Sequence, residues 1–192
     1  GEDRPEEIKL LVDKALSDPN KSVVAKRVKR SEGFLFQTLY KLHKYITLFS
    51  TAKLINFGNY SCLTSNDAKI LSAKSSLWSS YSGTFKKYVK NYNEVNSIRG
   101  TRYFGPSQMS LYKLLVHSFS IIAVFKYTVI FLSLALLSLM YYLEILIKFN
   151  FIIFQILLIL FNILIFIVSF RENEKEFENS QNDVASVEKL TH

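Results

Sequence analysis

Cysteine is almost absent from this sequence of 192 residues, since Cys62 is the single one. An internal disulfide is therefore excluded, and a cysteine-based metal site is not expected. The three histidines are scattered and have no acidic or thiol partner at metal-ligand spacing. The sequence also has no glycine-rich phosphate loop, nucleophile elbow or carboxylate pair. We therefore predict that the protein is not an enzyme and holds neither a metal ion nor a cofactor.

Charged residues are rare in one long segment, the sixty residues from Leu111 to Phe170. A helix crosses a bilayer core with about 20 apolar residues, so this segment has material for more than one crossing. One continuous helix of this length would measure about 90 Å, roughly three times the hydrocarbon thickness, which excludes a single straight crossing. We predict two transmembrane spans, over about 127–147 and 149–170. The four charged residues in the segment are Lys113, Lys126, Glu144 and Lys148.

The connection between the two predicted spans has no local turn signal. Neither Gly nor Pro occurs from Glu144 to Asn150, so nothing in the sequence demands a tight hairpin there. Glu144 and Lys148 are four residues apart, a spacing that predicts an ion pair on a helix surface. The alternative is one span preceded by a helix that lies in the plane of the membrane.

The N-terminal region is basic and has the apolar periodicity of amphipathic helices. Residues 1–126 carry 20 Lys or Arg and 9 Asp or Glu, whereas residues 171–192 carry 3 basic and 6 acidic residues. Three helical elements are predicted, with loops around Cys62 and over 97–107. The first covers residues 3–17. The second starts at Lys21 and has an apolar seam through 35–49, and the third covers residues 65–95 and has an aromatic stripe.

The predicted fold is therefore an all-α membrane protein with an amphipathic helical head and a two-helix transmembrane hairpin. It has four parts in chain order. They are a basic amphipathic helical region (1–106), a membrane-approach helix (107–126), a transmembrane block (127–170) and an acidic tail (171–192).

Positive charge flanks the transmembrane block on its outer sides. Lys113 and Lys126 precede the first span, and Arg171 and Lys175 follow the second, whereas Lys148 alone lies between them. The positive-inside rule therefore predicts that both ends lie in the cytosol or in the mitochondrial matrix.

The interleaved tyrosines and lysines of 86–102 could also suit single-stranded nucleic acid. A packed aromatic stripe is the favoured interpretation, and no nucleic-acid partner is expected.

The basic residues of the head are candidates for contact with anionic lipid headgroups, possible partners including cardiolipin. The competing interpretation is a solvated face of a lysine-rich protein. The candidates are Lys26, Arg27, Lys29, Arg30, Lys86, Lys87, Lys90, Arg99, Arg102, Lys113 and Lys126.

Four polar side chains inside the predicted spans are candidates for a helix–helix contact. Gln155 and Asn162 are seven residues apart, hence on one face of the second span, and Ser133 and Ser138 lie in the first. Polar groups in lipid need partners. The hairpin satisfies them internally in one interpretation, and another membrane subunit does so in the other.

These features together predict a non-catalytic accessory subunit of a large membrane complex. The mitochondrial inner membrane is the expected location, in a complex of the respiratory-chain or ATP-synthase type, with both termini in the matrix. No signal peptide is recognisable in residues 1–20, and Gly1 in first position is expected if a targeting segment has been removed.

Two other function classes stay open. The first is a membrane-shaping or tethering protein of an organelle such as the ER or peroxisome, with cytosolic termini. Residues 34–49 and 70–92 would be its membrane-inserting faces. The second is a membrane enzyme or transporter that uses Glu144, Lys126 and His117.

Overall fold

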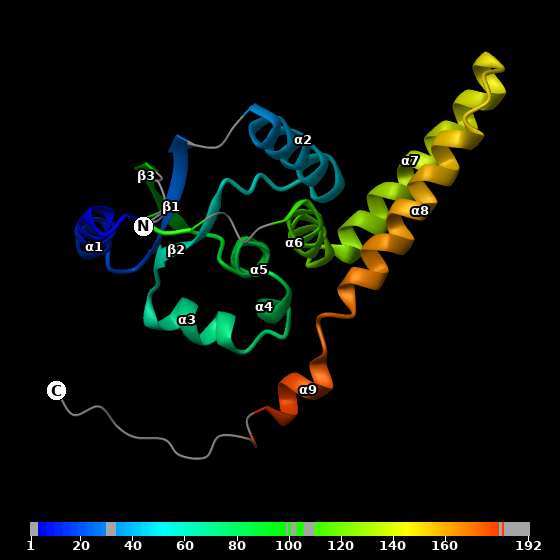
Figure 1. Ribbon diagram of the computed structural model, residues 1–192. Helices are drawn as coiled ribbons and strands as arrows, with labels where there is room; N and C mark the ends of the chain where they lie inside the picture. The colour runs from blue at the N-terminus through cyan, green and yellow to red at the C-terminus, as the bar shows by residue number, and fades with distance from the viewer. Residues whose placement is uncertain are drawn as a thin grey trace.

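Helices dominate the structure, and two of them form a long hairpin that projects from a mixed head (Figure 1). The computed structural model describes residues 4–29, 34–98, 100, 103–105, 110–180 and 182. The described elements are α1 (Glu6–Ser17), β1 (Ser22–Lys29), α2 (Phe34–Thr51), β2 (Phe57–Cys62), α3 (Ser65–Ser72), α4 (Ser76–Ser79), α5 (Tyr81–Tyr88), β3 (Tyr92–Ile98), α6 (Leu111–Ala123), α7 (Lys126–Ile147), α8 (Ile152–Ser169) and α9 (Glu174–Asn179).

The prediction of an all-α head is wrong, because the head contains a three-stranded sheet in the order β2-β1-β3. The central strand β1 runs antiparallel to β2 and parallel to β3. It occupies residues that were predicted to be helical, and β2 occupies the predicted loop around Cys62. A strand that is covered on both faces carries apolar residues without alternation, so the run from Val23 to Ala25 gave no period-two signal.

The two faces of β1 form two separate parts of the head core. Val23 and Ala25 pack with Leu11 of α1 on one face. Val24 faces the other way and packs with Phe57 and Phe85, together with Leu71 and Val89. The helix predicted over 3–17 is confirmed as α1, although Leu11 is its single buried residue.

The predicted helix over 65–95 is also wrong as one element, because it is divided into α3, α4, α5 and the strand β3. The division before α5 falls at Ser80, whose backbone is extended and whose Oγ accepts a hydrogen bond from the Gly83 amide at 3.2 Å. The aromatic stripe packs in the core instead: the ring centroids of Phe85 and Tyr92 are 5.1 Å apart. Thr64 caps α3 by accepting a hydrogen bond from the Asp67 amide at 3.1 Å.

Polar contacts fix the ends of α1 and β3 against each other. Asn93 donates to Asp18 Oδ2 at 3.2 Å, and Lys21 lies 2.8 Å from the same oxygen. These hydrogen bonds, from Lys21 first and Asn93 second, hold the pKa of Asp18 below its ordinary value. Elsewhere in the head, burial raises the pKa of Tyr81, whose hydroxyl contacts that of Ser61.

The helix α6 joins the head to the hairpin, as expected for the approach segment 107–126. It begins at Ser110, which accepts a hydrogen bond from the Lys113 amide at 3.2 Å. It packs against α4 and α5 on the head side and against α7 and α8 on the hairpin side. Ile122 and Ala123 at its end are buried against Ile165 of α8. The base of the hairpin is therefore held in a hydrophobic contact with the head.

The described part of the acidic tail returns toward the head. Asn173 caps α9 by accepting from the Glu176 amide at 3.1 Å. The ring of Phe177 lies against that of Trp78 in α4, with centroids 5.5 Å apart. The first part of the segment 171–192 is thus packed on the same head helices that contact α6.

Candidate functional site

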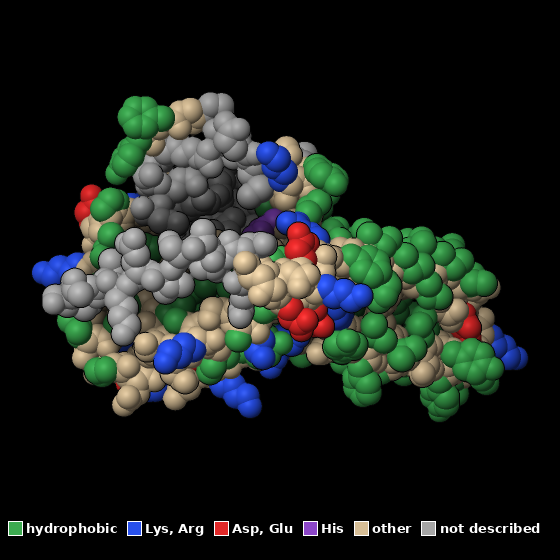
Figure 2. Space-filling model, turned by 90° about the horizontal axis from the view of Figure 1, so that it is seen from below, with side chains coloured by type: hydrophobic (Ala, Val, Ile, Leu, Met, Phe, Trp, Pro, Cys, Tyr) green, Lys and Arg blue, Asp and Glu red, His purple; other side chains and the backbone are tan. Residues whose placement is uncertain are grey.

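The hairpin of α7 and α8 is the feature that sets this molecule apart, because its apolar side chains face outward. Both helices are long and apolar enough to cross a membrane. The core helix of a soluble protein passes the same test of length and composition, but such a helix is mostly buried. Here only 6% of the most apolar window of α7 and 11% of that of α8 and the adjoining residues is buried. Figure 2 shows hydrophobic side chains over the hairpin, with charged groups near its base and tip.

The turn of the hairpin is built without glycine. Lys148 ends α7 in the left-handed conformation, with φ 54° and ψ 29°. Glu144 Oε1 then accepts a hydrogen bond from the Phe151 amide at 2.6 Å, and Asn150 Oδ1 accepts from the Ile152 amide at 2.8 Å. The two side chains thus accept hydrogen bonds from amides at the start of α8, which have no partner within the helix. The Glu144 carboxylate also lies at the positive end of the α8 dipole, where a negative group is stabilising.

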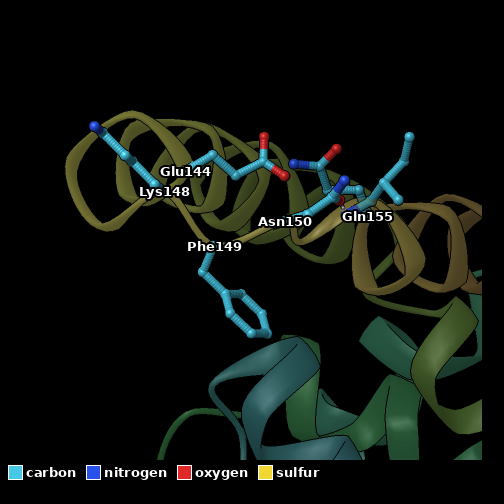
Figure 3. Close-up of a pocket in the computed structure, with 6 residues that line it drawn as sticks. Glu144, Lys148, Phe149, Asn150 and Gln155 are labelled. Atoms are coloured by element: carbon cyan, nitrogen blue, oxygen red, sulfur yellow. Dashed lines mark hydrogen bonds between the residues drawn. The ribbon is translucent and has the colours of Figure 1, made fainter.

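The predicted ion pair between Glu144 and Lys148 is therefore wrong. Lys148 lies beyond the last turn of α7, and its ammonium group points away from the Glu144 carboxylate (Figure 3). Glu144 turns toward the start of α8 instead. A shallow hollow at this tip is lined by Glu144, Lys148, Phe149, Asn150, Ile152 and Gln155.

Inside the hairpin, Asn162 and Ser133 are brought together. Asn162 Nδ2 donates to Ser133 Oγ at 2.8 Å and to the Leu158 carbonyl at 2.8 Å. Asn162 Oδ1 is buried and accepts no hydrogen bond from a described residue. The internal interpretation of the polar groups is thus the one that the structure shows for this pair.

The other two predicted contact residues lie elsewhere. Ser138 faces outward and donates to the carbonyl of Leu134 in its own helix at 2.9 Å. Gln155 lies at the tip hollow beside Glu144 and Asn150 (Figure 3). The four residues do not form one continuous stripe.

An ion pair closes the base of the hairpin. Lys126, the first residue of α7, lies with Nζ 3.1 Å from Glu172 Oε2, just after the end of α8. The Glu172 side chain is only 9% exposed and that of Lys126 is 24% exposed, so both groups are largely removed from water. The adjacent Arg171 donates to Ser120 Oγ of α6 at 3.1 Å. Both ends of the hairpin are therefore tied to each other and to α6.

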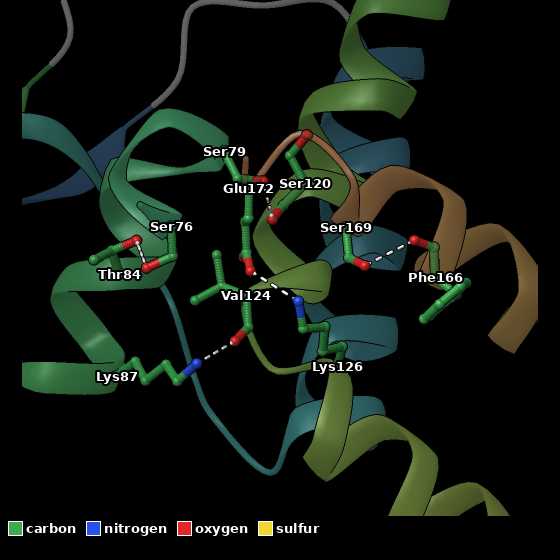
Figure 4. A network of polar contacts seen from close by, with 10 residues as sticks. All are labelled: Ser76, Ser79, Thr84, Lys87, Ser120, Val124, Lys126, Phe166, Ser169 and Glu172. Carbon is green, nitrogen blue, oxygen red and sulfur yellow. Dashed lines mark hydrogen bonds and ion pairs between the residues drawn. The ribbon is translucent and has the colours of Figure 1, made fainter. Parts of the chain in front are cut away.

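The head provides the other half of this polar base (Figure 4). Lys87 of α5 donates to the carbonyl of Val124 at 2.8 Å, directly after the end of α6. A cation at this place stabilises the negative end of the α6 dipole. Ser79 of α4 donates to the carbonyl of Ser120 at 3.4 Å. Sequence reasoning placed Lys87 and Lys126 among headgroup ligands, but no motif marked the contacts of Glu172 or Ser79.

The helix α5 approaches α6 closely at Gly83. A Cβ atom on Gly83 would lie 3.1 Å from the carbonyl oxygen of Ile121 and 3.1 Å from Cγ2 of Val124. The absence of a side chain at Gly83 thus leaves room for the contact that joins the head to the hairpin.

Lys26 and Lys86, two of the predicted headgroup residues, make contacts within the head. Lys26 pairs with Glu94 across the sheet at 3.1 Å, and Lys86 donates to the Tyr92 hydroxyl at 2.5 Å. Lys90, between α5 and β3, and Lys113, in α6, are exposed. Arg27 and Lys29 belong to β1, although their side chains are not described, and Arg30, Arg99 and Arg102 lie outside the described residues.

Comparison of the chain with protein-family models, with curated proteins and with solved structures found no match. Within the described ranges, no three His, Cys, Asp or Glu residues gather where they could hold a metal ion. The geometry of the hairpin, of its base and of the head is therefore the basis for a functional proposal.

Proposed function

We propose that the protein is an integral membrane protein, anchored by the α7–α8 hairpin, which serves as a non-catalytic accessory subunit of a membrane complex. The proposed anchoring is supported by two observations: the apolar surface of α7 and α8 faces outward, and the hydrogen bond between Asn162 and Ser133 lies between the two helices. This distribution suits lipid as the solvent of the hairpin, because lipid offers no partners for polar groups. With 22 residues, α7 is about 33 Å long, close to the thickness of the hydrocarbon core.

The orientation follows from the charges at the two ends of the hairpin. Lys126 and Arg171 lie at the base and Lys113 lies in the first turn of α6, whereas Lys148 is at the tip. From the positive-inside rule we infer that the head and tail lie in the cytosol or the mitochondrial matrix. The mitochondrial inner membrane is the location that we propose, and it is supported only by the basic head and this orientation.

The accessory role is supported by the tip and by the build of the head. The tip hollow presents Gln155 beside Glu144, which offers polar groups to a neighbouring subunit. The head is fixed to the hairpin through α6 by the contacts of Lys87, Arg171 and Gly83. In this role the hairpin contacts a membrane subunit and the head holds a peripheral one.

The membrane-shaping alternative keeps only one of its two inserting faces. The apolar residues of 70–92 are largely used in the core, where Leu71, Phe85 and Val89 are buried. In the other segment, the described residues from 42 to 49 include exposed apolar side chains of α2.

Labelling of single cysteines from each side of a vesicle tests the anchoring. In a Cys62→Ser background, Lys148→Cys at the tip and Leu16→Cys on the head are treated with a membrane-impermeant maleimide. We expect the two sites to react from opposite sides. Reaction of both from the same side of intact vesicles would contradict a spanning hairpin.

Migration on native gels tests the accessory role. We expect the protein to migrate with other chains, and a protein that is fully ordered and monodisperse without partners would contradict this role.

A further inference from the structure

From residue 42 to 51, where the side chains are described, α2 turns threonines toward the protein and large apolar side chains outward. Thr47 and Thr51 are 2% and 1% exposed, so they lie on the packed side. Leu42, Tyr45 and Phe49 are 54%, 58% and 80% exposed. An amphipathic helix on the surface of a soluble protein has the opposite arrangement. The outward face of α2 is therefore unlike the water-exposed face of a helix in a soluble protein.

The packed side of α2 does not need water either. Thr51 Oγ1 donates to the Thr47 carbonyl at 2.6 Å, one turn back in the same helix. Thr47 Oγ1 lies 3.3 Å from His43 Nδ1, within hydrogen-bond distance. The threonines can therefore be buried against α6 and α7 at little cost, because their hydroxyls have partners in the helix itself.

The position of α2 puts its outward face close to the base of the hairpin. It packs against α6 and α7 and lies beside the base of the hairpin, nearer to it than the sheet or α3 (Figure 1). Tyr127 and Phe131, in the first turns of α7, are 75% and 71% exposed. A membrane that surrounds the hairpin thus has its surface near the level of α2.

The charges around α2 suit the surface of a membrane. Lys41, Lys44 and Lys53 occur in or just after the helix, and no Asp or Glu occurs from 33 to 66. Lysine beside an apolar helical face is the pattern of helices that lie in the headgroup region of anionic membranes.

We propose that α2 lies in the plane of the membrane, with Leu42, Tyr45, Ile46 and Phe49 inserted at the boundary between headgroups and acyl chains. This proposal rests on the membrane-spanning hairpin proposed above, because the hairpin places α2 at the leaflet surface. The occupant of the apolar face is lipid of the leaflet on the side of the head.

Tryptophan depth measurements test this arrangement in the full chain. Trp78 is the single tryptophan, and Trp78→Phe leaves a background into which one probe is introduced. The α2 probe is Phe49→Trp, the matched head control is Leu16→Trp, and the hairpin reference is Phe131→Trp. Each protein is placed in vesicles of phosphatidylcholine and phosphatidylglycerol with bromine on the acyl chains near the headgroups.

We expect bromolipid to reduce the emission of the Phe49→Trp protein by about twofold and to leave that of the Leu16→Trp protein unchanged. If position 131 is quenched and position 49 is not, α2 does not lie on lipid, although the hairpin still spans. If neither is quenched, the spanning hairpin itself is excluded. Blue-shifted emission from position 49 without quenching would assign the face to a second copy or another protein, which also overturns the proposal. Tyr45→Trp, on the same face, replaces Phe49→Trp if that variant does not fold.

Discussion

Lys126 Nζ lies 3.1 Å from Glu172 Oε2, so the first residue of one hairpin helix pairs with a residue just beyond the end of the other. Forty-six positions separate the two residues in the sequence. The pair closes the hairpin at its base, where the apolar helices meet the polar head. The second carboxylate oxygen of Glu172 is buried without a hydrogen bond from a described residue, so the carboxylate depends on Lys126.

Lys126→Met should therefore destabilise the protein by about 1–3 kcal/mol, because it leaves a largely buried carboxylate without its cation. The double variant Lys126→Met with Glu172→Gln should recover part of this loss, since it removes the charge as well. Thermal unfolding in detergent measures both effects. Lys148→Met is the matched control, because Lys148 lies at the exposed tip, and a loss as large in this control would show that the pair has no special role.

Two serines of α7 allow a matched test of the polar contact inside the hairpin. Ser133→Ala removes the acceptor of Asn162 Nδ2 and should cost about 0.5–1.5 kcal/mol, the range of polar contacts between membrane helices. Ser138→Ala removes a hydroxyl that bonds only within its own helix, so little change is expected. Denaturation in mixed micelles compares them. Equal effects would mean that the interhelical hydrogen bond contributes nothing measurable.

The substitution Gly83→Ala reports on the contact between the head and α6. In a helix that makes no close contact this change would stabilise by about 0.5–1 kcal/mol. Here the added Cβ would lie 3.1 Å from the carbonyl oxygen of Ile121, and we expect a loss of about 1–3 kcal/mol. Lys90→Ala, at an exposed position after α5, is the control. An increase in the unfolding temperature of Gly83→Ala would contradict the close packing of α5 on α6.

The left-handed residue at the hairpin turn offers a stabilising substitution. Lys148 has φ 54°, a conformation that glycine adopts without the cost imposed by a Cβ atom. Lys148→Gly should therefore stabilise the hairpin by roughly 0.5–1 kcal/mol, and Lys148→Ala should not. The measurement is the unfolding midpoint of each variant. Equal midpoints for the two variants would argue against the left-handed turn.

The lowered pKa of Asp18 predicts a pH dependence of the head. A carboxyl group whose pKa is lower in the folded state stabilises that state above its unfolded pKa near 4. This contribution is lost as the pH falls through the folded pKa. Asp18→Asn should thus lower the unfolding temperature slightly at pH 7 and less at pH 3. Asp13→Asn, on the exposed side of the same helix, is the control, and a difference that does not vary with pH would contradict the linkage.

The sequence by itself determined the two long apolar helices and the helix at 3–17, whose apolar residues have a clear period. The two predicted spans, about 127–147 and 149–170, agree with α7 and α8 within a few residues. This succeeded because sustained apolar composition over such a length has few structural solutions. The helix over 3–17 followed likewise from local periodicity and from the turn at 18–20.

Only the tertiary structure decided where the sheet lies and which polar groups meet. The first half of β1, from Ser22 to Ala25, is buried on both faces and has no alternation, and its partners β2 and β3 are distant in sequence. Lys126 with Glu172 and Asn162 with Ser133 are brought together by the turn of the hairpin, which no local residue signalled. The exposure of the α2 apolar face also depends on which side packs against α6 and α7. Helical periodicity predicts that one face of a helix is apolar. Only long-range packing decides whether that face is buried in the protein or exposed on its surface.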